Sequence, residues 1–552
     1  MTLFALLSLS SCGEPAPDSP GTAPDSAGPA ADAPRFEPLS DLRFLRRLSL
    51  DLRGTLPSVD EYLQVESDPA AILSLRAAWM EDPLFEERLV MLLGERWHTL
   101  IDEFDGFYYD FQLSGDQRYD FQRSVGQEPL RLLAHVVTAD LPWSDVVTAD
   151  YTMVNPLLAD IWPVEGYPEG GEGWLPATYT DGRPAAGVLA TNGLWWRYSS
   201  TTFNQNRARA AVIARLLVCE DLLTRPVTFA GSEELLLAED TSSMVRSVPA
   251  CLACHSTVEP LAAALFGFYL IQPASAYEKT LYHPEREIIG PLELQVEPAF
   301  FGTPVNGLEE LGRVIAADER FAACAVETFT EALLARDTTL DDFLETERLQ
   351  KDFVAGDLRV KPLLAAVMDM PEYRAGGITD AVTDTDADQP MTARMVGAPL
   401  LRSIYLDLTD YDWVMYGTAL LDDDLYGVRV LGGGVDGEFM LTPQQDPGMT
   451  WALVAERTAQ LMAQVIVGNE LVEGVGHGDL LSGASLALPS TDPAWEQVVG
   501  LLHLRLFGER PDVERLAAYA DLFERLQVGA DAETAWTGLL VAMLRDPEFL
   551  AY

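Results

Sequence analysis

Basic residues are scarce in this chain of 552 residues, which has 37 Lys and Arg against 86 Asp and Glu and a formal net charge of −49. A protein that binds nucleic acid through its phosphates needs a surplus of positive side chains, so this balance excludes that partner class. Long apolar runs are also missing, since none reaches the roughly 18 to 20 residues that a membrane-spanning helix requires. With 48% hydrophobic and 22% charged residues, the composition is that of a folded globular protein.

Strand signals are few, and this predicts a mainly α protein. From Asp41 onward, apolar residues recur at the three- and four-residue spacing of helices. The main helical patterns cover roughly 127–160, 207–224, 258–272, 308–335, 359–374, 451–475, 494–507 and 511–550. One short β-hairpin is predicted, in which 428–431 would pair with 438–441. We therefore expect a multi-helix module followed by a smaller, related helical module, with little β structure.

Two internal similarities indicate how the modules are related. Residues 44–52 (FLRRLSLDL) are similar to 400–408 (LLRSIYLDL). Residues 363–373 are similar to 539–549, ending in Pro-Glu-Tyr and Pro-Glu-Phe respectively. An acidic, Thr-rich stretch at 377–390 has the composition of a solvated linker, which separates the two copies.

The N-terminus has the features of an export signal. An apolar run from Leu3 to Leu9 is followed by Ser10, Ser11 and Cys12, a sequence that resembles the lipobox of bacterial lipoproteins. In that class the signal is cut before the cysteine, so Cys12 would carry a lipid anchor. Residues 13–34 are almost wholly Pro, Ala, Gly, Ser, Asp and Thr and are predicted to form a flexible tether. The predicted location is the periplasm or cell surface. Gly13 follows the cysteine in place of Asp, which favours the outer membrane by resemblance to the known sorting of bacterial lipoproteins.

One motif carries chemistry, namely Cys251-Leu252-Ala253-Cys254-His255, which has the form C-x-x-C-H. Two thiols one helical turn apart can each bond to a vinyl group of one haem, and the adjacent histidine then meets the iron. Cys251 and Cys254 are therefore predicted to hold one covalent haem c, with His255 as the proximal iron ligand. We expect a helix that begins at or just before Pro260, where the missing N–H costs nothing, to form an apolar wall beside it.

Other interpretations of the motif remain open. Zinc would need a second pair of Cys or His residues at finger or ribbon spacing, and none follows. A thioredoxin-like dithiol would lie at a strand-to-helix turn, whereas the surroundings here are mostly helical. A plain structural disulfide between Cys251 and Cys254 is the third alternative.

The remaining cysteines form an even number. With one lipidated and two on haem, Cys219 and Cys324 are left, and an oxidising compartment favours a bond between them. Such a bond would close a loop of about 105 residues and stabilise the fold by roughly 4 to 5 kcal/mol. The alternative is two buried, unpaired thiols.

The sixth iron ligand is not predicted by the sequence. No methionine lies between His255 and Met368, where small cytochromes c commonly have one. The residues that remain available through folding are His283, Met244, Met153, His98 and His135. An open iron would favour ligand or peroxide chemistry, and two protein ligands would favour electron transfer.

Several stretches together resemble one bacterial family. They are 44–54, 134–162, 187–219 with its Asn204-Gln205-Asn206-Arg207 segment, 249–261 and 321–334. The chain is similar to the planctomycete-type cytochrome c proteins and their associated domains of unknown function. This resemblance implies a helical, exported, haem-bearing protein with no established reaction. Members of this family usually have Asp-Pro after the motif, whereas this chain has Glu259-Pro260. The second module resembles the family only at Asp546 to Phe549.

These observations predict a division of the chain and a function. The divisions are 1–34 (signal and tether), 36–165 (N-terminal helical domain), 166–300 (haem region), 301–376 (helical end of the first module), 377–390 (acidic linker) and 391–552 (second helical module). The predicted function is a monohaem c-type cytochrome lipoprotein that transfers electrons to a basic redox partner. A peroxidase-like haem enzyme is one alternative, and a structural or scaffold lipoprotein with a C-x-x-C disulfide is the other.

Overall fold

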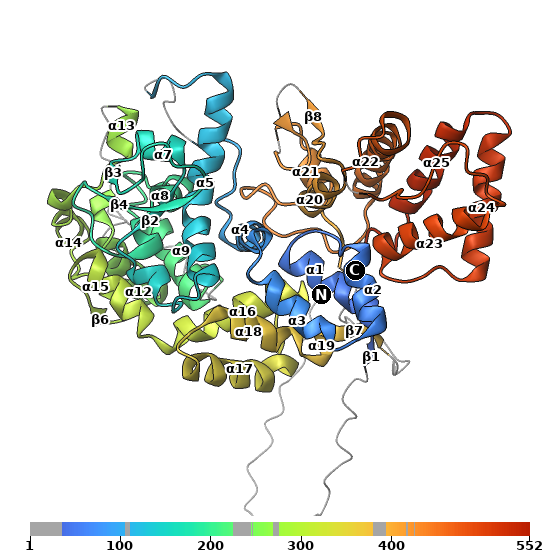
Figure 1. Ribbon diagram of the computed structural model, residues 1–552. Helices are drawn as coiled ribbons and strands as arrows, with labels where there is room; N and C mark the ends of the chain where they lie inside the picture. Colours follow the sequence, from blue (N-terminus) through green and yellow to red (C-terminus); the bar gives the residue numbers. More distant parts are fainter. Residues whose placement is uncertain are drawn as a thin grey trace, which may run out of the picture.

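The computed structural model describes residues 36–104, 111–224, 244–245, 247–268, 275–378, 394–415, 418–423, 425–477 and 479–552. It is mainly α with little β, as the periodicity predicts. Figure 1 shows the chain as a broad arc, with the first module at the left and below and the second at the right. The C-terminus lies near the middle, beside α1 (Asp41–Leu52), and β1 (Phe36–Pro38), where the described chain begins, lies below it. The predicted lipidation site Cys12 and most of the predicted linker lie outside the described residues.

The first module is built from helices with short strands between them. Its α-helices include α1 (Asp41–Leu52), α2 (Val59–Ser67), α3 (Ala71–Trp79), α4 (Pro83–Trp97), α5 (Gly115–Thr138), α6 (Asp145–Thr148), α7 (Pro156–Ile161), α8 (Asn192–Arg197), α9 (Arg207–Val218), α12 (Pro249–Ala263), α13 (Ala276–Lys279), α14 (Ile289–Leu294), α15 (Gly307–Ala316), α16 (Glu319–Leu334), α17 (Phe343–Ala355), α18 (Val360–Met368) and α19 (Pro371–Arg374). Its strands and 3-10 turns include β1 (Phe36–Pro38), β2 (Thr152–Val154), β3 (Val164–Glu165), β4 (Leu175–Tyr179), β5 (Ala299–Phe300), β6 (Thr303–Pro304), β7 (Ala375–Ile378), η2 (Gly187–Ala190), η3 (Phe266–Phe268), η4 (Pro284–Arg286) and η5 (Leu340–Asp342). β4 pairs antiparallel with both β2 and β3, while β5 pairs with β6.

The second module repeats this helical character. Its elements include α20 (Ala398–Thr409), β8 (Val414–Met415), β9 (Thr418–Ala419), α21 (Val428–Leu431), α22 (Met449–Val467), the π-helical turn η6 (Gly468–Glu473), α23 (Pro493–Phe507), α24 (Val513–Gln527) and α25 (Ala532–Leu544). Several of the many aspartates lie at the starts of helices in both modules, where their side chains accept hydrogen bonds from backbone N–H groups. Such caps are Asp82, Asp318, Asp492, Asp512 and Asp531.

The predicted hairpin of 428–431 with 438–441 is wrong. Residues Val428–Leu431 form the helical turn α21, which begins after Gly427 in the left-handed region (φ +71°). In the second segment, an Asp436 oxygen accepts the backbone N–H groups of Glu438, Phe439 and Met440 at 2.7–2.8 Å. These N–H groups are therefore committed to a local turn and are not available to a partner strand.

Each module brings its own two ends together. In the first, β1 pairs antiparallel with β7. In the second, Arg394 exchanges backbone hydrogen bonds with Tyr552, and the N–H of Val396 donates to the carbonyl of Leu550. In each module, therefore, the segment at the end of the module is hydrogen-bonded to the segment at its beginning.

Helix α1 contacts both of these returning segments through two adjacent arginines. Arg47 donates to the carbonyls of Tyr373 (2.7 Å) and Ala375 (2.9 Å) in the first module. Arg46 donates to the carbonyls of Phe549 (2.7 Å) and Ala551 (3.0 Å), the corresponding positions of the second. Both arginines are buried, so α1 joins the two modules by fixed, water-excluded hydrogen bonds.

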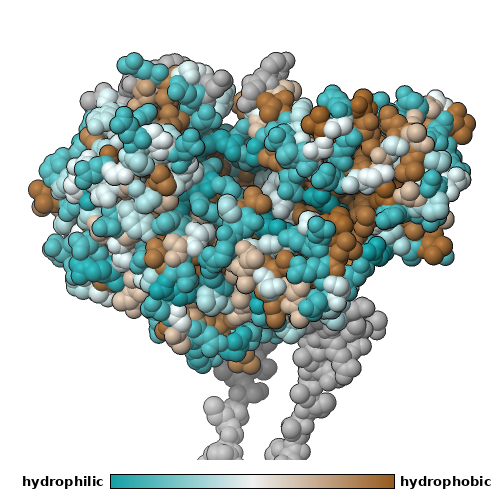
Figure 2. Space-filling view, viewed as in Figure 1, coloured by the Kyte–Doolittle hydropathy of each residue, from teal (hydrophilic) through white to brown (hydrophobic). Residues whose placement is uncertain are grey.

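The hydrophobic cores follow the same division. The main core of the first module and that of the second are separate clusters, but Leu504 of the second module belongs to the first cluster, and Leu50 and Leu56, from the end of α1 and the turn after it, belong to the second. In Figure 2, hydrophobic residues gather on the visible face of the second module, while the first module is mostly hydrophilic. Among the described helices, none combines the length and apolar character needed to cross a bilayer.

Candidate functional site

The C-x-x-C-H motif lies in the first two turns of α12. The expectation that the helix begins near Pro260 is wrong, because α12 begins at Pro249 and Pro260 lies inside it. Pro249 occupies the first helical position, where its fixed φ suits a helix and its missing N–H is not needed. Pro260 is tolerated further along because the carbonyl that would have bonded its N–H belongs to Ser256, which is exposed to water.

The three residues of the motif share one face of α12. Positions 251, 254 and 255 are spaced i, i+3 and i+4, which places their side chains together on a helix. Cys251 and Cys254 are free thiols and are half-buried. The His255 side chain is 27% exposed. Cys254 also makes a weak S–H hydrogen bond to the carbonyl of Leu222, at 3.6 Å. Two accessible thiols and an imidazole are therefore presented on one side of the helix.

A buried carboxylate lies directly behind the imidazole. The Nδ1 atom of His255 is 2.7 Å from Oε1 of Glu259, whose side chain is only 4% exposed. The Nε of Arg207, at the start of α9, donates to the same oxygen at 2.7 Å. Burial acts to raise the pKa of Glu259, but the hydrogen bonds from His255 and Arg207 outweigh it, so the pKa lies below its usual value. Glu259 is therefore ionised and available as an acceptor.

These side chains fit the requirements of a covalently attached haem. Neither thiol is in a disulfide, and the contact of Glu259 with Nδ1 of His255 directs the other ring nitrogen, Nε2, away from Glu259. A histidine that ligates a metal through one nitrogen commonly donates the other N–H to a carboxylate or carbonyl. In addition, Oε2 of Glu259 is buried and has no hydrogen-bond partner among the described residues. Cys251 and Cys254 would hold the group and His255 would bind its iron.

The other two cysteines form a disulfide. Cys219, directly after α9, is bonded to Cys324 in α16, with a Cα–Cα distance of 5.2 Å. This is the pairing expected from the cysteine count. Arg96 donates to the sulfur of Cys219 at 2.9 Å, and α9 packs against both α16 and α12. The bond therefore fixes the helix that carries Arg207.

The candidate sixth ligands lie in different surroundings. The N–H of His283 donates to the carbonyl of Gly267, in the 3-10 turn η3 that follows α12. Met153 lies in the main core and His135 packs edge-on against Tyr151. Met244 is buried and precedes α12, with its carbonyl bonded to the N–H of Val248. None of these contacts brings a second ligand to His255.

His98, the remaining candidate, is buried at the end of α4. Its Nε2 lies 2.8 Å from the carbonyl of Leu441, in the second module. Burial, with the nearby charges of Arg215 and Arg197, lowers the pKa of His98 from 6.5 to about 4. The ring is thus neutral in the folded protein at neutral pH.

His98 should make the fold sensitive to acid. Between these two pKa values the unfolded chain binds a proton that the folded protein does not, so stability falls as the pH drops from 6.5 toward 4. Between about pH 7 and pH 5 this amounts to roughly 2 kcal/mol. The variant His98→Asn should lack this part of the loss, and asparagine tolerates the left-handed φ of 52° at this position. Urea titrations at both pH values measure the free energy of unfolding of the two proteins. Equal pH dependence in the two proteins would contradict this.

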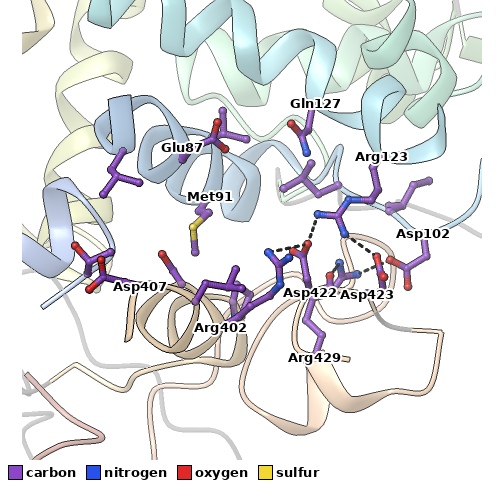
Figure 3. A pocket seen from close by; sticks show the side chains of 18 residues that line it. Glu87, Met91, Asp102, Arg123, Gln127, Arg402, Asp407, Asp422, Asp423 and Arg429 are labelled. Carbon is purple, nitrogen blue, oxygen red and sulfur yellow. Dashed lines mark hydrogen bonds and ion pairs between the residues drawn. The ribbon is translucent and has the colours of Figure 1, made fainter. Parts of the chain in front are cut away.

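A separate cavity of about 330 Å³ lies between the modules (Figure 3). Its walls come from α4 and α5 on one side and from α20, α21 and residues 422–423 on the other. Arg123 reaches across to pair with Asp422 and Asp423, and Arg402 pairs with Asp422 at 3.5 Å. Arg123 thus joins the two modules across the cavity by its ion pairs with both aspartates. No residue of α12 lines it.

Among the residues that the structure describes, no group of three or more His, Cys, Asp or Glu side chains is placed to hold a metal ion. The chain matches no protein-family model, no curated protein and no solved structure.

Sequence reasoning did not predict the roles of Glu259 and Arg207. The signal for Glu259 was present, because a residue four positions after His255 on a helix must lie beside it. Arg207 had no such signal, because it is 52 residues from Glu259 in sequence and meets it only through the packing of α9 on α12.

Proposed function

We propose that this protein is an exported, monohaem c-type cytochrome that transfers single electrons. One observation carries the proposal: Cys251 and Cys254 remain free thiols on the same helix face as His255, while the other two cysteines in the described residues are used in a disulfide. The thiols have the spacing for two thioether bonds to one haem, and His255 is oriented by Glu259 with Nε2 available for the iron. Haem held in this way supplies one-electron oxidation and reduction.

The location and the partner are part of the same proposal. Lipidation at Cys12 would anchor the protein at a membrane surface through the tether at 13–34, on the periplasmic or outer side. The large negative charge would attract a basic redox partner, and the rate of encounter would fall as the salt concentration rises.

The proposal is tested by expression with export and haem-maturation machinery. We expect a Soret band that survives acid-acetone extraction and an intact mass greater by one haem than that of the mature, lipidated polypeptide. The double variant Cys251→Ala, Cys254→Ala should retain no covalent haem. The matched variant Cys219→Ala, Cys324→Ala also removes two cysteines and should keep it. Colourless wild-type protein with the mass of the mature, lipidated chain and no haem would refute the proposal.

Cyanide binding distinguishes electron transfer from the alternative of a haem enzyme. Two protein ligands exclude added cyanide from the ferric iron, whereas an open position binds it readily. An unchanged Soret band at millimolar cyanide would support electron transfer through an iron with two protein ligands. A rapid shift would instead favour the haem enzyme.

A further inference from the structure

We propose that Glu259 is a positioning residue that accepts the Nδ1 proton of His255, and that Arg207 holds Glu259 in place. The inference rests on the proposed haem attachment for its redox consequence, but the contact itself exists without haem. It assigns a role to two residues outside the C-x-x-C-H motif.

The contacts support a directed chain of three side chains. Oε1 of Glu259 lies 2.7 Å from both His255 Nδ1 and Arg207 Nε, so it receives two short hydrogen bonds. Further bonds from Arg207 to the carbonyls of Phe203 (3.2 Å) and Asn204 (3.1 Å) fix the guanidinium. Since the Glu259 side chain is almost fully buried, water competes little for its oxygens.

This chain has two effects on His255. First, it selects the tautomer with the proton on Nδ1, which leaves the lone pair of Nε2 free for a metal. Second, a carboxylate acceptor draws the Nδ1 proton toward itself and raises the basicity of the ring. A more basic ligand favours the ferric over the ferrous state, so Glu259 should lower the reduction potential. Arg207 shares the carboxylate charge and limits this effect.

The first experiment uses the full chain produced without haem. Long-range ¹H–¹⁵N NMR of the histidine rings at mildly alkaline pH identifies which nitrogen of His255 carries the proton. We expect the Nδ1–H tautomer in the wild type and a shift toward Nε2–H in Glu259→Gln. The same tautomer balance in both proteins would overturn the inference, whether or not haem binds.

The second experiment measures the reduction potential of the haem-loaded protein. Glu259→Gln should favour the reduced state at least tenfold, which is about 59 mV for a one-electron couple. Arg207→Gln should lower the potential, because Glu259 stays beside His255 through its i,i+4 spacing on α12 while the cation that shares its charge is lost. If both variants keep the wild-type potential, Glu259 does not act on His255.

Glu220→Gln is the matched control for a simple effect of charge. Glu220 is close to the site, because it lies two residues before Leu222, whose carbonyl contacts Cys254. Glu220 interacts electrostatically with Arg320, and its replacement removes the same charge, so it should leave the tautomer unchanged and move the potential much less. A shift equal to that of Glu259→Gln would overturn the positioning role. Failure of the wild type to load haem would refute the proposed function, while the NMR result still decides the contact.

Discussion

Replacing Asp51 with Asn should destabilise the protein by about 3–5 kcal/mol, because it breaks a buried ion pair at the junction of the modules. The Asp51 carboxylate is fully buried and accepts from Arg394 at 2.7 and 2.8 Å. It also accepts from the hydroxyls of Tyr373 (2.7 Å) and Tyr552 (3.1 Å). The neutral amide would leave the buried Arg394 without its counter-ion.

The measurement is urea unfolding followed by circular dichroism and tryptophan fluorescence. Because Tyr373 belongs to the first module and Arg394 and Tyr552 to the second, we expect Asp51→Asn to weaken both modules. A transition that separates into two steps would show that the junction has loosened. A loss of stability below about 1 kcal/mol would contradict a buried, compensated pair.

The internal similarity provides the matched control. Asp407 of α20 corresponds to Asp51 of α1 in the aligned segments, but its side chain is 33% exposed and its nearest cation, Arg505, is 3.7 Å away. Burial raises the pKa of Asp407 despite the nearby arginines, so its charged form is disfavoured. Asp407→Asn should change the stability by less than about 1 kcal/mol.

Loss of the disulfide is the second large effect expected. Cys219→Ala with Cys324→Ala should lower the free energy of unfolding by about 4–5 kcal/mol, the entropy of closing a loop of 105 residues. Urea titrations of the oxidised protein and the double variant measure the difference, and reduction of the wild type should reproduce it. Labelling of both cysteines in unreduced, unfolded wild-type protein would contradict the bond.

The other cysteine pair is the control for this experiment. In haem-free protein, Cys251→Ala with Cys254→Ala also removes two sulfurs, but from half-buried positions that close no loop. Its stability should stay within about 1 kcal/mol of the wild type. An equal loss in the two double variants would mean that side-chain burial, rather than the cross-link, stabilises this region.

Local patterns predicted the helical class well, but they failed where the chain has special conformations. The 438–441 segment has strand-like residues, yet Asp436 turns it by accepting three N–H groups. Pro260 is a typical first residue of a helix, yet α12 begins eleven residues earlier, at Pro249. Both prolines satisfy the same local rule, but in the folded chain α12 continues through Pro260 and packs on α9 and α14.

The sequence by itself determined the chemistry that depends on spacing along one helix. Cys251, Cys254 and His255 lie on one face because three and four residues complete a helical turn, and the cysteine count indicated the pair Cys219 and Cys324. Only the tertiary structure brought Arg207 to Glu259, and Arg46 and Asp51 to the end of the second module. Those contacts join residues from 52 to about 500 positions apart, where no periodicity connects them. They depend on which helices pack together, and that is decided by the burial of whole apolar faces.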